Sequence, residues 1–403
     1  MAPPTTQKAL IQTPKPGSGS GSSAIDGGSD SGGLLPLSIS PAPVPTLPSP
    51  NHVLIRVRAV ALNPNDHKML DNFPVPGNGA GCDFCGVVEE LGSSVDSAVF
   101  LPGKTRVCGA VFPYSANLTP EEAAHRGIGA FAEWIVADSS LLLRVPEAWS
   151  DLQGAALGGV GWSTLGLAIS HPEALGLSGL PSSPAPVVEA SGNKRPVLVY
   201  GGGTATGTMA CQLLKFSGYS PVAVVYSDTS AALAKKYGAE VIKKFNREKQ
   251  IASQATESPL TDEPIRHVID CITDADSASF CFAAVTRTGG RYACLERFRD
   301  AWKTRRIVRV KEVMGYEALG DAVDIGGPDS VYTRPANESA FKVGMNWREE
   351  MQRLLDRGMV EPHPIREITE GKGGAGGWDG VVAGLLELKT GRVRGRKLVV
   401  RIS

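Results

Sequence analysis

The stretch VLVYGGGTATGTMACQLLKFSGY, Val197–Tyr219, decides the fold. It begins as a short apolar strand, bends through a glycine-rich loop and continues as a helix that Gly218 ends. A strand, a glycine-rich turn and a helix in this order are typical of a site that holds a phosphate at the helix N-terminus. The glycines read G-G-G-T-A-T-G, which departs from the usual G-x-G-x-x-G pattern of dinucleotide sites.

Each small residue of this loop has a physical use. Gly201 permits the tight turn after the strand, and Gly203 or Ala205 lets the backbone approach a pyrophosphate. Gly207 lets the helix pack closely against the strand. Three hydroxyl side chains add donors near the phosphates: Thr204, Thr206 and Thr208. The loop is therefore expected to bind a dinucleotide.

Strand and helix patterns continue to alternate after this loop. Strands are expected at 221–226, 239–245, 267–273 and 290–296, and helices at 208–217, 230–237 and 276–286. Such alternation predicts parallel strands joined by right-handed crossovers. We therefore expect a doubly wound Rossmann sheet over residues 161–339, with its ligand at the carboxyl ends of the strands.

The rest of the chain has a different texture. Residues 51–160 consist mostly of short strands with turn signals, which predicts a β-rich, barrel-like domain. Residues 340–403 add two helical patterns and a last strand, and we expect them to return to that domain. A first strand is expected within 1–13. The Gly, Ser and Pro content of 14–50 predicts a flexible loop. The predicted fold class is thus α/β, with a barrel-like domain beside a Rossmann domain.

Composition excludes several classes of function. The 403 residues suggest two domains, and 41 Lys plus Arg balance 41 Asp plus Glu. Neither a nucleic acid nor a membrane is therefore an expected partner. The seven cysteines are scattered, which favours a reducing, cytoplasmic compartment. The pair Cys82 and Cys85 lacks further ligands at metal spacing, so no metal is expected.

The end of the second Rossmann strand bears on the choice between NAD and NADP. An acid such as Asp228 favours the free ribose hydroxyl of NAD. Ser227 together with Lys235 or Lys236 favours the 2′-phosphate of NADP. Asp228 also fits a helix N-cap. The residues by themselves leave the choice open.

Several stretches resemble a known family. ALNPNDHKM at 61–69 and AALGGVGWSTLGLAI at 155–169 are similar to the quinone-reductase-like branch of the medium-chain dehydrogenase/reductase superfamily. HVIDCITDADSASFCFAAVTRTGGRYACL at 267–295, GRKLVVRI at 395–402 and the opening stretch resemble the fungal trans-acting enoyl reductases, the group of the lovastatin enoyl reductase. These enzymes serve reducing polyketide synthases whose own enoyl-reductase domain is inactive.

The resemblance implies a GroES-like catalytic domain, NADPH as cofactor and a polyketide on an acyl carrier protein as substrate. The partner would be a polyketide synthase or a synthase–peptide synthetase hybrid, and the chain would be a monomer. Zinc-dependent members of the superfamily carry a Gly-His-Glu motif. The corresponding stretch here, GAGCDFCGVV at 79–88, has no His-Glu pair, so a zinc-independent enzyme is expected.

The same resemblance implies which residues hold the ligands. Cofactor contacts are expected from Asn65, Asp66, His67 and Lys68 at the nicotinamide, Thr204, Ala205, Thr206 and Gly207 at the pyrophosphate, Ser227 and Asp228 at the adenosine phosphate, Phe245 at the adenine, and Leu295, Arg396 and Lys397 over the cofactor. Substrate contacts are expected from Leu165, Gly166, Leu167, Ala168, Ile169, Ser170, Glu317, Ala318, Leu319, Gly320 and Asp321. Asp228 departs from what an NADPH site prefers.

The implied reaction reduces an α,β-unsaturated thioester through an enolate, which needs positioned donors more than a strong nucleophile. Lys68 and Thr164 match active-site positions of the family, and they are the expected catalytic residues. Each also has an ordinary reading, Lys68 as a solvated lysine and Thr164 as a helix cap. No sequence feature identifies the donor of the α-carbon proton. Three tyrosines could act as acids or could simply pack in the core: Tyr226, Tyr292 and Tyr316.

Two groups of basic residues could dock an acidic carrier protein, or could simply be solvated faces. They are Lys303, Arg305, Arg306, Arg309 and Lys311, and Arg392, Arg394 and Arg396. Two other functions remain open for the chain. It could be a free-standing quinone or enone reductase, or a nucleotide-binding protein without catalysis.

Overall fold

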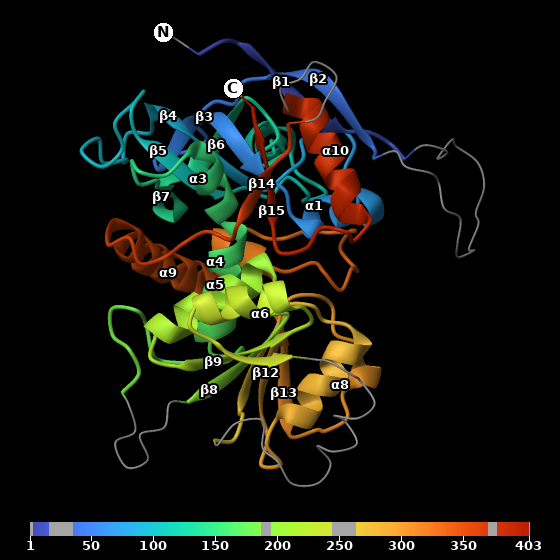
Figure 1. Cartoon of the computed structure of the whole chain (residues 1–403). Helices are drawn as coiled ribbons and strands as arrows, with labels where there is room; N and C mark the ends of the chain where they lie inside the picture. Colours follow the sequence, from blue (N-terminus) through green and yellow to red (C-terminus); the bar gives the residue numbers. More distant parts are fainter. Residues whose placement is uncertain (1–2, 16–34, 187–194, 244–262, 370–376, 403) are drawn as a thin grey trace, which may run out of the picture.

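The computed structural model describes residues 3–15, 35–186, 195–243, 263–369 and 377–402. Figure 1 shows two halves, with both chain ends in the upper half and a parallel sheet in the lower half. Helices α4 (Val160–Ser170), α5 (Ala205–Phe216) and α9 (Glu338–Asp356) lie between them. None of the helices in these ranges combines the length and apolar character needed to cross a bilayer.

The lower half is a six-stranded sheet in the order β10-β9-β8-β11-β12-β13. Every neighbouring pair is parallel. The strands are β8 (Pro196–Tyr200), β9 (Ser220–Val225), β10 (Glu240–Lys243), β11 (His267–Asp270), β12 (Gly290–Cys294) and β13 (Val308–Glu312). The strand order reverses between β8 and β11, which marks the ligand-binding edge of such a sheet. The predicted doubly wound sheet is confirmed.

The helices of this half follow the predicted alternation. Besides α5, they are α6 (Asp228–Lys236) and α8 (Ala275–Ala284). All five residues of β8 are buried, which is why the sequence reads as an uninterrupted apolar run at this strand. The first turn of α5 begins three residues earlier than predicted because Thr204 caps it.

The upper half is a mainly antiparallel sheet in the order β14-β15-β3-β4-β5-β7, with β6 also paired to β3. Its strands are β3 (His52–Ala61), β4 (Asp83–Leu91), β5 (Arg106–Ala110), β6 (Trp134–Asp138), β7 (Leu143–Arg144), β14 (Ile365–Glu367) and β15 (Lys397–Arg401). Register shifts in β3 at Leu54/Ile55 and Val57/Ala59 help the sheet to curve. The last strand, β15, pairs with β3, so the chain end returns to this half.

Short helices complete the upper half. They are α1 (Pro64–Asn72), α2 (Pro120–Arg126), α3 (Asp151–Leu157) and α10 (Gly377–Lys389). Helix α10 contacts α1 and β15. Residues 14–50 were expected to form a flexible loop, but part of this segment is a strand. Strand β2 (Leu37–Pro43) pairs antiparallel with β1 (Thr6–Gln12).

Strand β2 was hidden by its prolines. Pro41 and Pro43 have no amide to donate, which normally argues against a strand. In this two-stranded sheet β2 pairs only with β1, so one of its edges needs no donors. Residues 16–34 of the expected loop lie outside the described residues.

Helix α9 joins the two halves. It contacts α4 and η3 (Gly315–Leu319) on one side, and η1 (Ser139–Leu141) and β7 on another. It begins at Glu338 because the Asn337 side chain caps it by accepting from the Ala340 amide. The buried Trp347 seats the helix against α4.

Candidate active site

The glycine-rich loop opens at the carboxyl end of β8. The Thr204 hydroxyl accepts from the Gly207 amide at 3.0 Å and donates to the Gly201 carbonyl at 2.8 Å. Gly201 has a φ of +78°, which favours glycine. Ala205 and Thr206 form the first turn of α5 and are partly exposed. The loop thus presents a capped helix N-terminus, which suits an anion.

The same loop fits a dinucleotide because it has no room for side chains. A Cβ at Gly207 would overlap the Gly201 carbonyl oxygen. A Cβ at Gly203 would overlap the Ser230 side chain at the start of α6. Gly207 therefore lets α5 pack closely against the end of β8, and the approach of the backbone to a pyrophosphate stays a prediction.

The adenosine side is formed by the start of α6. Ser227 caps this helix by accepting from the Ser230 amide at 3.1 Å, and Asp228 is its first residue. Lys236 forms an ion pair with Glu361. Lys235 is exposed and makes no ion pair among the described residues. Phe245, expected near the adenine, lies outside the described residues.

Helix α1 reaches from the upper half to the lower. Lys68 forms an ion pair with Glu296, just after β12, and both side chains are nearly half exposed. The Asn65 amide donates to the Tyr316 hydroxyl at 2.5 Å. His67 is half-buried 3.6 Å from Asp71, and burial lowers its pKa. Asn65 and Lys68 thus face the second half of the molecule, where the nicotinamide is expected.

Asp66 is placed differently from the expectation that it contacts the cofactor. Its side chain is fully buried, where it accepts from the Asn63 amide at 2.8 Å and from the Tyr114 hydroxyl at 3.3 Å. Burial raises the pKa of Asp66 to about 6. The carboxyl group closes the capping box of α1, and so it orients Asn65 and Lys68 from behind.

Thr164 lies beside the segment that carries Tyr316, the partner of Asn65. It is buried in α4, and its hydroxyl lies against Gly315, where a Cβ would overlap it. Tyr316, the next residue, holds Asn65 and lies 3.6 Å from the Cys82 thiol. Burial raises the pKa of Tyr316, so its phenol keeps its proton. Asn65 and Thr164, far apart in the sequence, therefore meet at Gly315–Tyr316.

The other two candidate tyrosines serve the fold. The Tyr292 hydroxyl donates to Asp270 at 2.6 Å inside the lower half. Tyr226 hydrogen-bonds Tyr200, although its ring is more than half exposed. Tyr292 matches the alternative reading as a packed core side chain, whereas Tyr226 is hydrogen-bonded but exposed and so does not pack in the core.

Asp83 is the residue that sequence reasoning missed. One carboxylate oxygen accepts from the amides of Gly159 and Val160 at 2.8 and 2.9 Å, at the start of α4. The other accepts from the Asn63 side chain at 2.9 Å and from Lys397 at 3.2 Å. An acid at the head of the apolar stretch 84–88 was the available signal.

The three residues expected to close over the cofactor, Leu295, Arg396 and Lys397, have different surroundings in the structure. Lys397 is buried, and its ammonium is held by Asn63 and Asp83 in place of a cofactor. Arg396 is exposed. Leu295 follows β12, and its amide donates to the Thr273 hydroxyl at 3.2 Å. Of this group, only Arg396 and Leu295 remain open to a cofactor role.

An open cleft lies at the carboxyl ends of β11 and β12, with a volume of about 380 Å³. A doubly wound sheet binds its ligand at this edge. The cleft also contains the predicted catalytic lysine. It is lined by Lys68, Ile272, Thr273, Asp274, Glu296, Arg297, Arg299, Trp302 and Tyr332.

The expected substrate residues of α4 are packed instead of open. Leu165, Ala168 and Ile169 are fully buried, and Gly166 lies against the Trp347 ring. Ser170 accepts from the Trp347 indole at 2.9 Å. These side chains fill the interface with α9, so an acyl chain along them would have to displace that helix.

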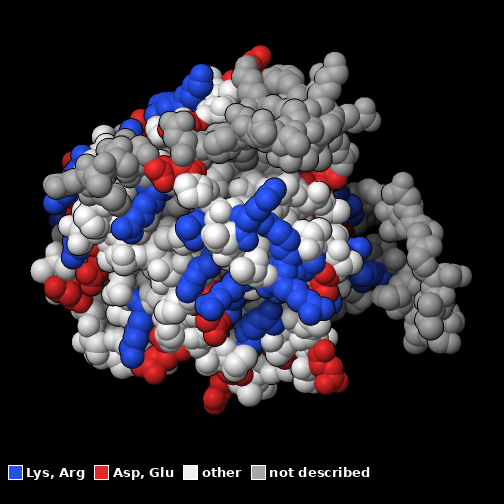
Figure 2. Space-filling model, turned by 90° about the horizontal axis from the view of Figure 1, so that it is seen from below, with Lys and Arg blue, Asp and Glu red and all other residues white. Residues whose placement is uncertain are grey.

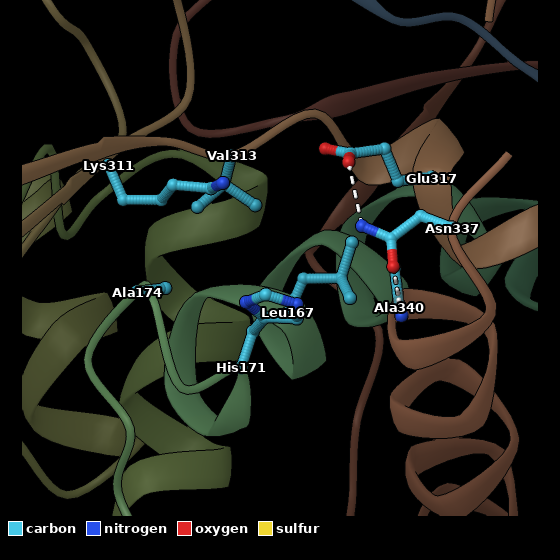
Figure 3. Close-up of a pocket in the computed structure, with 8 residues that line it drawn as sticks. All are labelled: Leu167, His171, Ala174, Lys311, Val313, Glu317, Asn337 and Ala340. Carbon is cyan, nitrogen blue, oxygen red and sulfur yellow. Dashed lines mark hydrogen bonds between the residues drawn. The ribbon is translucent and has the colours of Figure 1, made fainter. Parts of the chain in front are cut away.

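Figure 3 shows where the two expected substrate stretches meet, at Leu167 and Glu317. The cavity between them holds about 10 Å³, which is the space of one water molecule. Glu317 accepts from the Asn337 amide at 3.2 Å across it. The cavity is therefore too small for an acyl chain.

The remaining residues of that stretch serve mainly to shape it. Ala318 is buried, and Leu319 packs partly buried against the upper core. Gly320 has a φ of +88° where the stretch turns. Asp321 is exposed and lies 3.5 Å from Arg126. In this structure the open cleft, not this stretch, offers room for a substrate.

No three His, Cys, Asp or Glu side chains gather to hold a metal among the described residues. All seven cysteines are free thiols. Burial raises the pKa of both Cys82 and Cys85, which keeps them protonated. Zinc independence remains a prediction.

Comparison with known proteins agrees with this architecture. Residues 49–147 match the alcohol dehydrogenase GroES-like domain. The chain is similar to the quinone oxidoreductase structures of Coxiella burnetii (TM-score 0.60, 20% identity, 99% and 100% of the two chains covered) and Pseudomonas syringae pv. Tomato (TM-score 0.62, 18% identity, 98% and 99% covered). These likenesses establish the fold alone.

Closer relatives are also found. The trans-enoyl reductase calK of Penicillium decumbens is 49% identical, over 91% of this chain and 94% of its own length. The trans-enoyl reductase sthE of Phaeosphaeria nodorum is 46% identical, over 92% of this chain and 94% of its own length. The chain therefore belongs to the fungal trans-enoyl reductase family of the medium-chain dehydrogenase/reductase superfamily.

Proposed function

We propose that this chain is an NADPH-dependent, zinc-independent enoyl reductase that works in trans on an α,β-unsaturated polyketide thioester. The substrate is carried by the acyl carrier protein of a partner polyketide synthase or synthase–peptide synthetase hybrid. One observation carries the proposal most. Lys68 lines the open cleft, at the ligand-binding edge of the sheet, in a chain of this family. Asn65 on the same helix and Thr164 on α4 contact the neighbouring residues Tyr316 and Gly315.

NADPH, when bound, supplies the hydride for the β-carbon of the substrate. Thr204 and Gly207 would hold its pyrophosphate at the N-terminus of α5. Ser227 and Lys235 would contact the 2′-phosphate. Asp228 lies in the first turn of α6, next to this place, and it opposes a phosphate unless its carboxylate is turned away.

The side chains of this chain have separate tasks in the reduction. Lys68 supplies positive charge, and the Thr164 hydroxyl supplies a donor, toward the oxygen of the enolate. Glu296 holds Lys68 at the cleft before the substrate enters. Asn65 fixes the Tyr316 hydroxyl at 2.5 Å. The Tyr316 hydroxyl lies beside Asn65, and the preceding residue contacts Thr164, so by its position it is the candidate donor to the α-carbon, for which sequence reasoning found none. Because burial raises its pKa and weakens it as an acid, it suits only a strongly basic carbon such as that of the enolate.

The edge of the parallel sheet supports a monomer. Among the strands that the structure describes, β13 is the last on its side and pairs only with β12. It carries Arg309, Lys311 and Glu312. Charged side chains on an edge strand disfavour pairing with a second copy. The free thiols fit the reducing conditions of the cytoplasm, where we place the enzyme.

The experiment is to follow NADPH oxidation at the nicotinamide absorbance with crotonyl thioesters of coenzyme A, of a pantetheine mimic and of a carrier domain, beside 1,4-quinones. Turnover of the thioesters, fastest on the carrier, is expected. Turnover of quinones with inert thioesters would make the chain a quinone reductase. Binding of NADPH without oxidation by any substrate would make it a nucleotide-binding protein.

A further inference from the structure

A group of arginines lies at the amino ends of the parallel strands, opposite the open cleft. We call this surface the arginine face, and it consists of Arg195, Arg266, Arg287, Arg306 and Arg309. All five are exposed. Figure 2 looks onto the lower end of the molecule and shows basic side chains crowded over its centre.

The strand register places these residues together. His267 and Arg291 are partners across β11 and β12, and Arg291 and Arg309 are partners across β12 and β13. The Arg266 carbonyl accepts from the Arg291 amide at 2.8 Å, so Arg266 begins the neighbouring strand. Burial and the charges of Arg291, Arg266 and Arg195 lower the pKa of His267 to about 4, which agrees with a concentration of positive charge here.

The basic residues expected from the sequence to dock a partner divide into two kinds. Arg305 donates to the carbonyls of Phe282, Val285 and Thr286, so it holds the end of α8. Lys311 forms an ion pair with Glu173 at 2.5 Å. Within the described residues, the five side chains of the arginine face make neither an ion pair nor a hydrogen bond to another side chain. Their charge is available to a partner.

The type of partner follows from the composition of the face. Ile307 lies next to Arg306 and is 57% exposed, with its side chain against Gly289. An exposed aliphatic side chain among arginines is typical of a protein interface, where arginine is enriched. The chain as a whole has balanced charge, 41 basic against 41 acidic residues, which does not favour general binding to nucleic acid.

The position of the face makes delivery of the substrate from it indirect. Strand β8 has five residues. The amino and carboxyl ends of this strand are therefore about 17 Å apart, at about 3.3 Å per residue. A carrier protein bound at the arginine face would have to pass its arm around the whole sheet to reach Lys68. The face is thus suited to a fixed part of the synthase and leaves the cleft to the mobile carrier.

We propose that the arginine face binds an acidic surface on the body of the partner polyketide synthase, separate from its carrier domain. This inference rests on the proposed function. Such anchoring would raise the effective concentration of the loaded carrier at the cleft without any new contact to the substrate. Complementary charge would also speed the encounter at low salt.

The test compares the triple variant R266E/R306E/R309E with a matched control, K8E/K104E/R357E. The control changes net charge equally at exposed residues of other surfaces. Three substrates are used: a crotonyl-pantetheine thioester, an isolated crotonyl-loaded carrier domain, and the intact crotonyl-loaded partner synthase. Binding of the intact synthase to the immobilised chain is measured in parallel, at low and at physiological salt.

With the intact synthase at low salt, turnover and affinity of the triple variant should fall at least about tenfold. Turnover of the other two substrates should stay unchanged, and the control should match the wild type. An equal loss with the isolated carrier, or an unchanged synthase, would overturn the proposal. So would an equal loss in the control. If the wild type reduces none of the thioesters, the proposed enoyl reductase function is wrong. The binding of the intact synthase to the triple variant and to the control then decides whether the arginine face is a docking surface.

Discussion

Asp83 and Lys397 are 314 residues apart in the chain, yet their charged atoms lie 3.2 Å apart in the core. The same carboxylate caps the start of α4 through the amides of Gly159 and Val160. It thereby connects the helix that carries Thr164 to the last strand of the chain. Removing one partner of a buried ion pair leaves an uncompensated charge, which is strongly destabilising.

The variant Asp83→Asn is expected to lower the free energy of unfolding by about 3 kcal/mol. It should also lower kcat, because α4 loses a charged anchor at the end nearest Thr164. The double variant D83N/K397M should regain part of the stability, since the unpaired ammonium is then gone. Denaturant unfolding and steady-state kinetics measure both effects. Glu338→Gln, which breaks the exposed ion pair with Lys342, is the control. If the free energy of unfolding of the Asp83→Asn protein lies within about 1 kcal/mol of the wild-type value, this account is wrong.

The ion pair between Lys68 and Glu296 allows a test of whether the positive charge at the cleft is needed for catalysis, because each partner can be neutralised separately. Each side chain is nearly half exposed, so breaking the pair should change stability by less than about 1 kcal/mol. Lys68→Gln should lower kcat about 100-fold, because a positive charge aimed at the enolate is lost. Glu296→Gln should retain most of the activity. Equal losses of kcat in the two variants would show that the ion pair, and not the lysine, is what matters.

Tyr316 and Tyr292 form a second matched comparison. Tyr316→Phe should lower kcat about 100-fold, as expected for loss of a general acid. Tyr292→Phe removes only the bond to Asp270 and should cost about 1 to 2 kcal/mol of stability with little change in kcat. Kinetics with a crotonyl thioester and thermal unfolding of both variants supply the data. A Tyr316→Phe enzyme with normal kcat would return the proton donor to water.

Local patterns predicted most of the lower half of the molecule, but they missed its edge strand β13. Apolar strands and helices alternate in the sequence in the same order as in the folded sheet. For this reason β8, α5 and the strands and helices up to β12 were predicted. Strand β2 was missed because its prolines resemble a loop until the pairing with β1 is known. Composition cannot reveal such a partner.

The site was predicted less completely, for a different reason. Family resemblance identified Lys68, Thr164 and Thr204, but it carries no information about which way a side chain faces. Asp66 and Lys397 lie in suitable stretches and yet point into the core. Contacts such as Asp83 to Lys397 join residues far apart in sequence, and no spacing rule predicts them.

The choice of cofactor can be tested on two adjacent lysines. Lys236 is engaged by Glu361, whereas Lys235 is exposed at the same helix. Lys235→Ala should therefore raise the KM for NADPH about tenfold and leave the KM for NADH unchanged, since only NADPH carries the 2′-phosphate. Lys236→Ala should have a smaller effect. If the two variants behave alike, or if NADH is the better cofactor of the wild type, Asp228 determines the specificity instead.

The buried carboxyl group of Asp66 should make stability depend on pH. Burial raises its pKa from an ordinary value of 3.8 to about 6, so the folded state favours the protonated form. Its stabilising contribution is therefore complete below pH 3.8 and is lost as the pH rises through 6. Asp66→Asn keeps a neutral acceptor for the Asn63 amide at every pH. From pH 4 to pH 7 the variant should gain about 3 kcal/mol relative to wild type, at about 1.36 kcal/mol per pKa unit. Urea unfolding across this range measures the difference, with the exposed Asp329→Asn as control, and parallel curves for Asp66→Asn and wild type would mean that water reaches this carboxylate in the folded protein.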